Sequence, residues 1–213
     1  MNLFFSINQN FRKGKYYIII GLAIIALVLA ATEFIHQYRG IPYEDLTRDP
    51  NAISLKPKYI GFVSQIGIFF WFGAVSICLL GSMLLKRLAG DGMNIQYLRF
   101  FCFFSFVLGV DDVFMLHDES AHRGVNEQVV YIIYMLSFGY FILKFWKLVF
   151  KTNFNLIFIA GFLLAASIFM DTFYSSDFII EDGFKLSGIV FWFLYFLDTS
   201  ISFITLAVKN RLS

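Results

Sequence analysis

The sequence predicts an all-α, polytopic membrane protein with six transmembrane helices and both termini in the cytoplasm. Hydrophobic residues fill 59% of the 213 positions and charged residues only 15%, whereas a soluble domain carries about 25% charged residues. Six segments are apolar over the roughly 20 residues that a bilayer-spanning helix needs. The lipid bilayer is therefore the predicted partner, and a net charge of +2 is too balanced to indicate nucleic acid.

The predicted spans occupy most of a single transmembrane domain over residues 1–213. The first span, 16–36, follows three basic residues, a pattern that is also typical of a signal peptide. We expect it to be retained as an anchor, because Leu29 stands where cleavage after Ala31 would require a small residue. The connection 37–58 contains all three prolines, so it should be irregular or hold at most one short helix.

The other five spans are predicted from long apolar runs, at 59–85, 97–117, 128–149, 154–171 and 185–207. The third span contains a phenylalanine-rich run over 100–106, which we interpret as bulk that faces lipid or neighbouring helices. Cys78 and Cys102 lie within apolar runs and predict no disulfide.

The distribution of charge predicts the orientation, because Lys and Arg are enriched in cytoplasmic connections. With six spans, 11 of the 17 Lys and Arg residues lie on the side of the termini and 6 lie on the other side. Thirteen of the 15 acidic residues fall on that other, outer side. Acids contribute little to topology, so this second asymmetry indicates something about function.

Ionisable residues near the outer ends of four predicted helices are the main functional indication. A charge at a helix centre costs about 2.5–3.5 kcal/mol on insertion scales, so we expect these side chains to meet in a shared polar cavity. They are Glu33 and His36 in the first span, Asp111 and Asp112 in the third, Asp171 in the fifth, and Glu181, Asp182 and Lys185 at the sixth.

The third span would carry a polar stripe if its helix continued to position 122. At 100° per residue, five side chains would share an arc of about 120°. They are Asp111, Asp112, Asp118, Glu119 and His122. Such a stripe is typical of a water-filled pocket that opens to the outside.

Two Glu-x-x-His pairs, Glu33–His36 and Glu119–His122, indicate a divalent metal ion as a candidate cofactor. Paired motifs of this kind, with further carboxylates from two other helices, form the di-metal sites of ferritin-like bundles. Asp171 and Glu181 would supply those carboxylates here, with Asp112 in reserve. Local hydrogen bonds at helix ends and proton transfer are the alternatives.

The start of the last span also allows two interpretations. Glu181 and Lys185 form an i,i+4 pair in the favourable order. Lys185 therefore either neutralises its neighbours, or holds a carboxylate ionised and binds an anionic substrate, while Gly183 would let the backbone bend or approach closely. Asp198 lies about 20 Å further along the span, beside hydroxyl residues only, where an acid is either functional or neutral and hydrogen-bonded.

Two strings resemble a group of small bacterial multi-pass membrane proteins to which no activity is assigned. They are Asp-Asp-Val-Phe-Met-Leu-His-Asp-Glu at 111–119 and Glu-Asp-Gly-Phe-Lys at 181–185, together with Asn126, Glu127, Gly188, Trp192 and Tyr195. The resemblance covers about the second half of the chain and implies a membrane location. It directs attention to Asp112, His117, Glu127 and Lys185, and it features His117 rather than His122.

Three classes of function are compatible with these residues. The first is an outward-facing acidic and histidine site that acts as an enzyme on a lipid or other membrane-level substrate, with or without a metal, through Asp112, His117 and Lys185. The second is a channel or transporter for cations or protons, whose path an oligomer of identical chains could form, because an acidic vestibule concentrates cations. The third is a membrane sensor, scaffold or effector with a protein partner.

Overall fold

The computed structural model describes residues 19, 23, 25–27, 29–47, 50–55, 57, 59–116, 127–173 and 178–212. The regular secondary structure of these residues is entirely helical, which confirms the predicted all-α class. The chain forms two compact units, Met1–Ile60 and Gly61–Ser213.

The first unit contains one longer helical stretch and two short helices. Residues 29–39 are helical, and α2 (Tyr43–Thr47) and α3 (Pro50–Ile53) follow. The connection 37–58 thus holds two short helices, where at most one was expected. Pro50 explains the second, because its fixed φ and missing N–H suit the first position of a helix.

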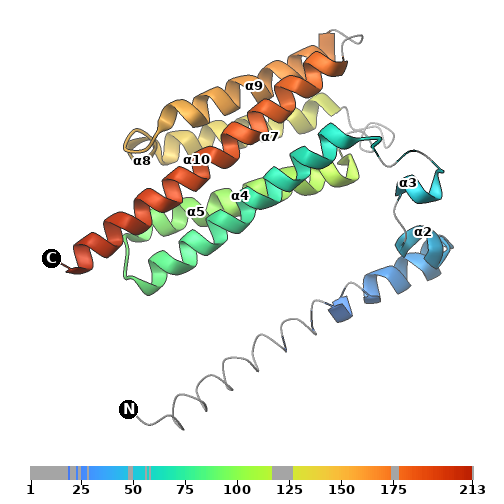
Figure 1. Cartoon of the computed structure of the whole chain (residues 1–213), viewed down its shortest axis with the longest axis horizontal. Coiled ribbons are helices and arrows are strands. Elements are labelled where there is room, and N and C mark those ends of the chain that lie inside the picture. Colours follow the sequence, from blue (N-terminus) through green and yellow to red (C-terminus); the bar gives the residue numbers. More distant parts are fainter. Residues whose placement is uncertain are drawn as a thin grey trace. The chain divides into compact units, whose positions relative to one another are not determined.

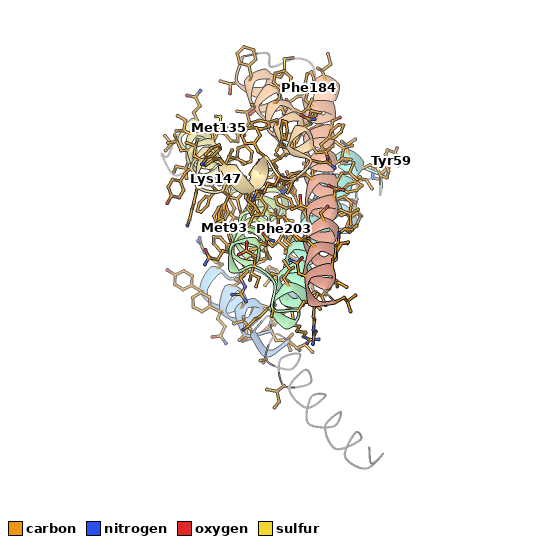
Figure 2. All side chains as sticks on the ribbon, turned by 90° about the vertical axis from the view of Figure 1, so that its left-hand side faces the viewer. Tyr59, Met93, Met135, Lys147, Phe184 and Phe203 are labelled. Atoms are coloured by element: carbon orange, nitrogen blue, oxygen red, sulfur yellow. The ribbon has the colours of Figure 1, made fainter. Side chains whose placement is uncertain are left out.

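The second unit is a bundle of helices in which α10 occupies the centre (Figure 1). Its elements are α4 (Phe62–Arg87), α5 (Gly92–Phe114), α7 (Glu127–Lys144), α8 (Trp146–Val149), α9 (Phe154–Phe173) and α10 (Phe178–Leu212). α10 packs against α4 on one side and α9 on the other, and α4 also packs against α5. Phe184 and Phe203 mark the two halves of α10 in Figure 2.

The predicted boundaries are close for α4 and α9 and wrong by several residues elsewhere. α5 begins at Gly92, before the predicted 97, because the side chain of Asp91 caps it by accepting a 3.0 Å hydrogen bond from the Met93 amide. The predicted span 128–149 is interrupted at Phe145, which separates α7 from α8. α10 extends beyond the predicted 185–207 at both ends.

Buried positions on α4 recur at alternating steps of four and three residues, which is the spacing of a left-handed helix pair. They are Gly67, Trp71, Ala74, Cys78, Gly81 and Leu85. α10 shows the same spacing at Ile189, Trp192, Phe196, Thr199 and Phe203. A Cβ atom on Gly67 would lie 3.1 Å from Ile189, and one on Gly81 would lie 3.0 Å from Ser200. α4 and α10 therefore run in the same direction, in close contact through small residues.

The Trp192 side chain lies at the centre of an aromatic core. Its ring centroid lies 5.3–5.9 Å from those of Trp71, Phe101, Phe104, Phe138 and Phe196. These rings come from α4, α5, α7 and α10 itself. The phenylalanine-rich run behaves as predicted, because Phe101 and Phe104 are buried while Phe103 and Phe106 are exposed.

Three described segments are long and apolar enough to cross a membrane, Phe62–Arg87, Phe154–Thr172 and Ile180–Leu212. Gln128–Lys144 is a shorter apolar helix. Large apolar side chains such as Phe69 and Phe162 are exposed on the outside of these helices, by 70% and 72%. Extensive apolar surface of this kind marks a membrane or protein interface, and together with the helix lengths it indicates association with a membrane.

Candidate functional site

A buried ion pair joins the end of α5 to the beginning of α10. One carboxylate oxygen of Asp112 forms a very short ion pair with the Lys185 ammonium. The Asp112 side chain is 5% exposed and the Lys185 side chain 36%. The second carboxylate oxygen of Asp112 is buried and has no hydrogen-bond partner among the described residues. Gly67 of α4 lies beside it, because a Cβ atom there would be 3.8 Å from this oxygen. The pair thus presents one free acceptor atom and one partly accessible cation.

Further acids gather around Lys185. Glu181, one turn earlier on α10, interacts electrostatically with Lys185 and with Asp171 of α9. The Tyr131 hydroxyl of α7 donates a 3.3 Å hydrogen bond to Asp171. We call Asp112, Lys185, Glu181 and Asp171 the Lys185 cluster. Its members come from α5, α9 and α10, so the structure brings together ionisable residues that are far apart in the sequence.

The neighbouring Asp111 has a different partner. It is also buried, and it forms a side-chain hydrogen bond with Tyr134 of α7. The two consecutive acids at the end of α5 therefore point to different helices, Asp111 to α7 and Asp112 to α10. This arrangement ties three helices together at one level.

The long polar stripe predicted for the third span does not form on a single helix. α5 ends at Phe114, and Met115 adopts a left-handed conformation with φ of 46°, which terminates the helix as in an αL cap. His117, Asp118, Glu119 and His122 follow this turn and lie outside the described residues. Glu127, the other residue featured by the resemblance, begins α7.

Glu33 and His36 are engaged in local contacts within the first unit. Glu33 accepts hydrogen bonds from Gln37 at 2.6 Å and from the Tyr43 hydroxyl at 2.5 Å. His36 Nδ1 lies 2.7 Å from the carbonyl oxygen of Ile41, and its ring stacks on Tyr43 with centroids 3.9 Å apart. The bond to Glu33 raises the pKa of the Tyr43 phenol above its usual value.

The metal prediction stays a prediction. No group of three or more His, Cys, Asp or Glu side chains gathers in a metal-binding arrangement within the part of the chain that the structure describes. Of the six predicted ligands, Asp171 and Glu181 are electrostatic neighbours. Glu119 and His122 lie outside the described residues.

Sequence reasoning missed a series of polar contacts between α5 and α10 that continues from the Lys185 cluster. Ser105 lies seven residues before Asp112, and Trp192 lies seven residues after Lys185. The Trp192 indole N–H donates a 2.9 Å hydrogen bond to Ser105. Further along, the hydroxyls of Tyr97 and Tyr195 lie 2.6 Å apart. We call these contacts the α5–α10 ladder. The seven-residue spacing of Ser105 from Asp112 and of Trp192 from Lys185 was a signal for the first of these contacts, whereas the Tyr97–Tyr195 contact does not follow that spacing.

The structure bears on two expectations for the last span. Asp198 is hydrogen-bonded, which agrees with one of its two expected alternatives: the Asn153 side-chain amide, just before α9, donates a 2.9 Å hydrogen bond to it. Gly183 neither bends the chain nor permits a close approach. α10 continues through it, and an added Cβ atom would meet nothing within 4 Å.

Comparison with known proteins gives one finding. No curated protein and no solved structure matches the chain. A family model described as a domain of unknown function, DUF8692, matches residues 20–199. The matched range contains the Lys185 cluster and the α5–α10 ladder. The chain therefore belongs to the DUF8692 family.

Proposed function

We propose that this chain is a multi-pass membrane enzyme whose Lys185 cluster acts on a lipid or another substrate at the level of the membrane surface. The observation that carries the proposal is the Asp112–Lys185 pair, which combines a buried carboxylate that has one unpartnered oxygen with a partly exposed ammonium. Buried ionisable groups within apolar helices are costly and mark functional sites.

The topology of this proposal has six spans, with both termini in the cytoplasm. Two pairs of helices run in opposite directions, as this topology requires. In α4 and α5, Gly109 approaches Trp71 while Leu98 approaches Gly81. In α9 and α10, Gly188 approaches Leu164 while Asp198 bonds to Asn153, just before α9. The last turns of α4 and α10 carry Lys86, Arg87, Lys209 and Arg211. Such basic ends favour the cytoplasmic side, so in this proposal the Lys185 cluster would lie on the outer side.

The cluster would suit an anionic headgroup when a divalent ion on Asp171 and Glu181 offsets the carboxylates around Lys185. Lys185 would bind a phosphate or carboxylate oxygen through its exposed side. The Asp112 carboxylate would act as a general base toward a substrate hydroxyl or a water molecule that enters beside Lys185. Its unpartnered oxygen is buried, so it would have to become accessible for this step. His117 follows Asp112 by five residues and would supply a second proton-transfer group. A divalent ion bound by Asp171 and Glu181 would polarise the reacting oxygen.

The test is a search for lipid turnover by the purified full-length protein in nanodiscs. Phospholipid products are followed by mass spectrometry, with added Mg²⁺, Mn²⁺ or Zn²⁺ or with a chelator. Asp112→Asn should lower turnover at least about 100-fold, because general-base catalysis contributes about 10²–10⁴-fold. Asp198→Asn is the matched control, because this half-buried acid lies on the same helix as Lys185 but away from the cluster, and it should retain activity. Absence of turnover in the wild-type protein under every condition would refute the enzymatic proposal.

A proton pathway is the second candidate, and the α5–α10 ladder favours it. Beyond the ladder, Thr152 bonds to the Tyr195 hydroxyl at 2.9 Å, so hydroxyl groups continue toward the other end of the bundle. Proton flux into proteoliposomes, measured with an internal pH-sensitive dye, tests this function. Tyr195→Phe should stop the flux, whereas equal flux in protein-free liposomes and proteoliposomes would exclude it.

A further inference from the structure

A pocket lies at the end of the bundle opposite the Lys185 cluster. It occupies about 260 Å³ between the turn that joins α4 to α5 and the last turns of α10. Since a water molecule takes about 30 Å³ of liquid, the pocket has the volume of roughly eight or nine waters. This space is sufficient for a phosphate group that carries a small alcohol or amine.

The polar groups of the pocket include hydrogen-bond acceptors and a cation, so they fit a ligand that has both donor groups and an anionic group. The Asn94 side chain lines the pocket and is 6% exposed, and its amide oxygen has no hydrogen-bond partner among the described residues. A buried amide oxygen without a hydrogen bond is costly, so this oxygen favours a ligand that carries a donor group. Asp91, which also lines the pocket, uses one carboxylate oxygen to cap α5 and leaves the other as a second acceptor.

The cationic wall of the pocket comes from the end of α10. Arg211 lines it, and its planar guanidinium suits bidentate binding of a phosphate. One anionic and one amide acceptor beside one arginine disfavour a bare phosphate, because its oxygens would face Asp91. They favour a phosphate ester whose headgroup also donates hydrogen bonds.

We propose that this pocket binds a phosphate ester that carries hydrogen-bond donor groups, with the phosphate on Arg211 and the donors on Asn94 and Asp91. A glycerophospholipid headgroup and a soluble phosphate ester share this chemistry. The site uses the topology proposed above, in which it faces the cytoplasmic leaflet, where basic pockets between helices bind lipid headgroups. It is independent of any catalysis at the Lys185 cluster.

The experiment measures lipid retained by the full-length protein in native mass spectrometry. Phosphatidylglycerol and phosphatidylethanolamine carry donor groups, whereas phosphatidylcholine carries the same phosphodiester without donors. We expect the first two to be retained about five- to ten-fold more strongly than phosphatidylcholine, as one or two hydrogen bonds would provide. Equal retention of all three lipids would overturn the proposal.

Variants separate a built site from general charge attraction. Arg211→Gln should reduce retention of every lipid about ten-fold, while Lys209→Gln, which removes an equal charge two residues earlier and outside the pocket lining, should not. Asn94→Leu should abolish the preference for lipids with donors, and Asn94→Ala, which also removes the acceptor oxygen, serves in its place if the leucine variant fails to fold. An equal effect of Lys209→Gln and Arg211→Gln would refute the site. Displacement of bound lipid by glycerol 3-phosphate would assign the pocket to a soluble ester, whereas its failure to compete assigns the pocket to lipid.

Discussion

Replacing Lys185 by methionine should destabilise the protein more than replacing its partner Asp112 by asparagine. Asp112 is 5% exposed at its side chain and forms an ion pair with the Lys185 ammonium. Removing one partner of a buried pair costs about 3–5 kcal/mol. Because Lys185 is 36% exposed, water can partly replace it, so we expect about 3 kcal/mol for Lys185→Met.

Replacing Asp112 should cost less stability than replacing Lys185. In Asp112→Asn the lysine can extend its long stem and carry its charge to water, so the expected loss is about 1–2 kcal/mol. The double variant removes both charges and should lie within about 1 kcal/mol of the wild-type protein. The coupling energy of the pair is the loss of stability in the double variant minus the sum of the losses in the two single variants.

The assay is reversible unfolding in mixed detergent micelles, followed by circular dichroism, on the wild-type protein and the three variants. Lys209→Met controls for the loss of an exposed lysine and should change the free energy of unfolding by less than about 0.5 kcal/mol. The reasoning is refuted if the double variant is no more stable than Lys185→Met, or if Asp112→Asn is the more damaging single substitution.

Two further predictions concern packing and pH. Gly188→Ala should lower the free energy of unfolding by about 1–2 kcal/mol in the same assay, because its Cβ atom would lie 2.7 Å from a Leu164 side-chain carbon and 3.1 Å from the Leu164 backbone nitrogen. Gly183→Ala, whose Cβ atom would meet no described atom within 4 Å, should raise it by up to about 1 kcal/mol. Equal effects of the two substitutions would contradict the packing of α10 on α9. The Tyr43 phenol has its pKa raised by its bond to Glu33, so the contribution of this bond to stability is present below the usual phenol pKa and is lost as the pH rises through the raised value. The ultraviolet tyrosinate titration of the wild-type protein minus that of Tyr43→Phe should show this pKa, and an unchanged midpoint in Glu33→Gln would exclude the bond as its cause.

The length of apolar runs was sufficient to locate α4 and α9, because burial in lipid or in the core demands apolar residues on every side of such helices. The same criterion placed the start of α10 too late. Glu181 and Asp182 end the apolar run, yet acids are favourable in the first turns of a helix because they complement its dipole. Counting apolar residues cannot detect a helix that continues into polar sequence.

The level of the Lys185 cluster could be predicted from charge, whereas the pairing within it could not. A lone carboxylate near the end of an apolar helix requires a partner, but only the contacts of α5 with α10 and with α7 select Lys185 for Asp112 and Tyr134 for Asp111. The Ser105–Trp192 contact lacks even the charge signal, because neither residue is unusual in a membrane helix. The buried positions that α4 and α10 use to pack together were equally hard to recognise in the sequence, because the exposed sides of these helices are apolar too.

The length of α10 has a mechanical consequence. Its 35 residues make a rod of about 52 Å at 1.5 Å per residue, while the hydrocarbon layer of a bilayer is about 30 Å thick. A helix that is longer than the hydrocarbon layer tilts further when the bilayer becomes thinner. Lys185 and Arg211 lie about 39 Å apart on this helix, so any change in its tilt would shift both residues at once relative to α4 and α9. In the proposed topology, a change in membrane thickness would therefore move both ends of α10 together.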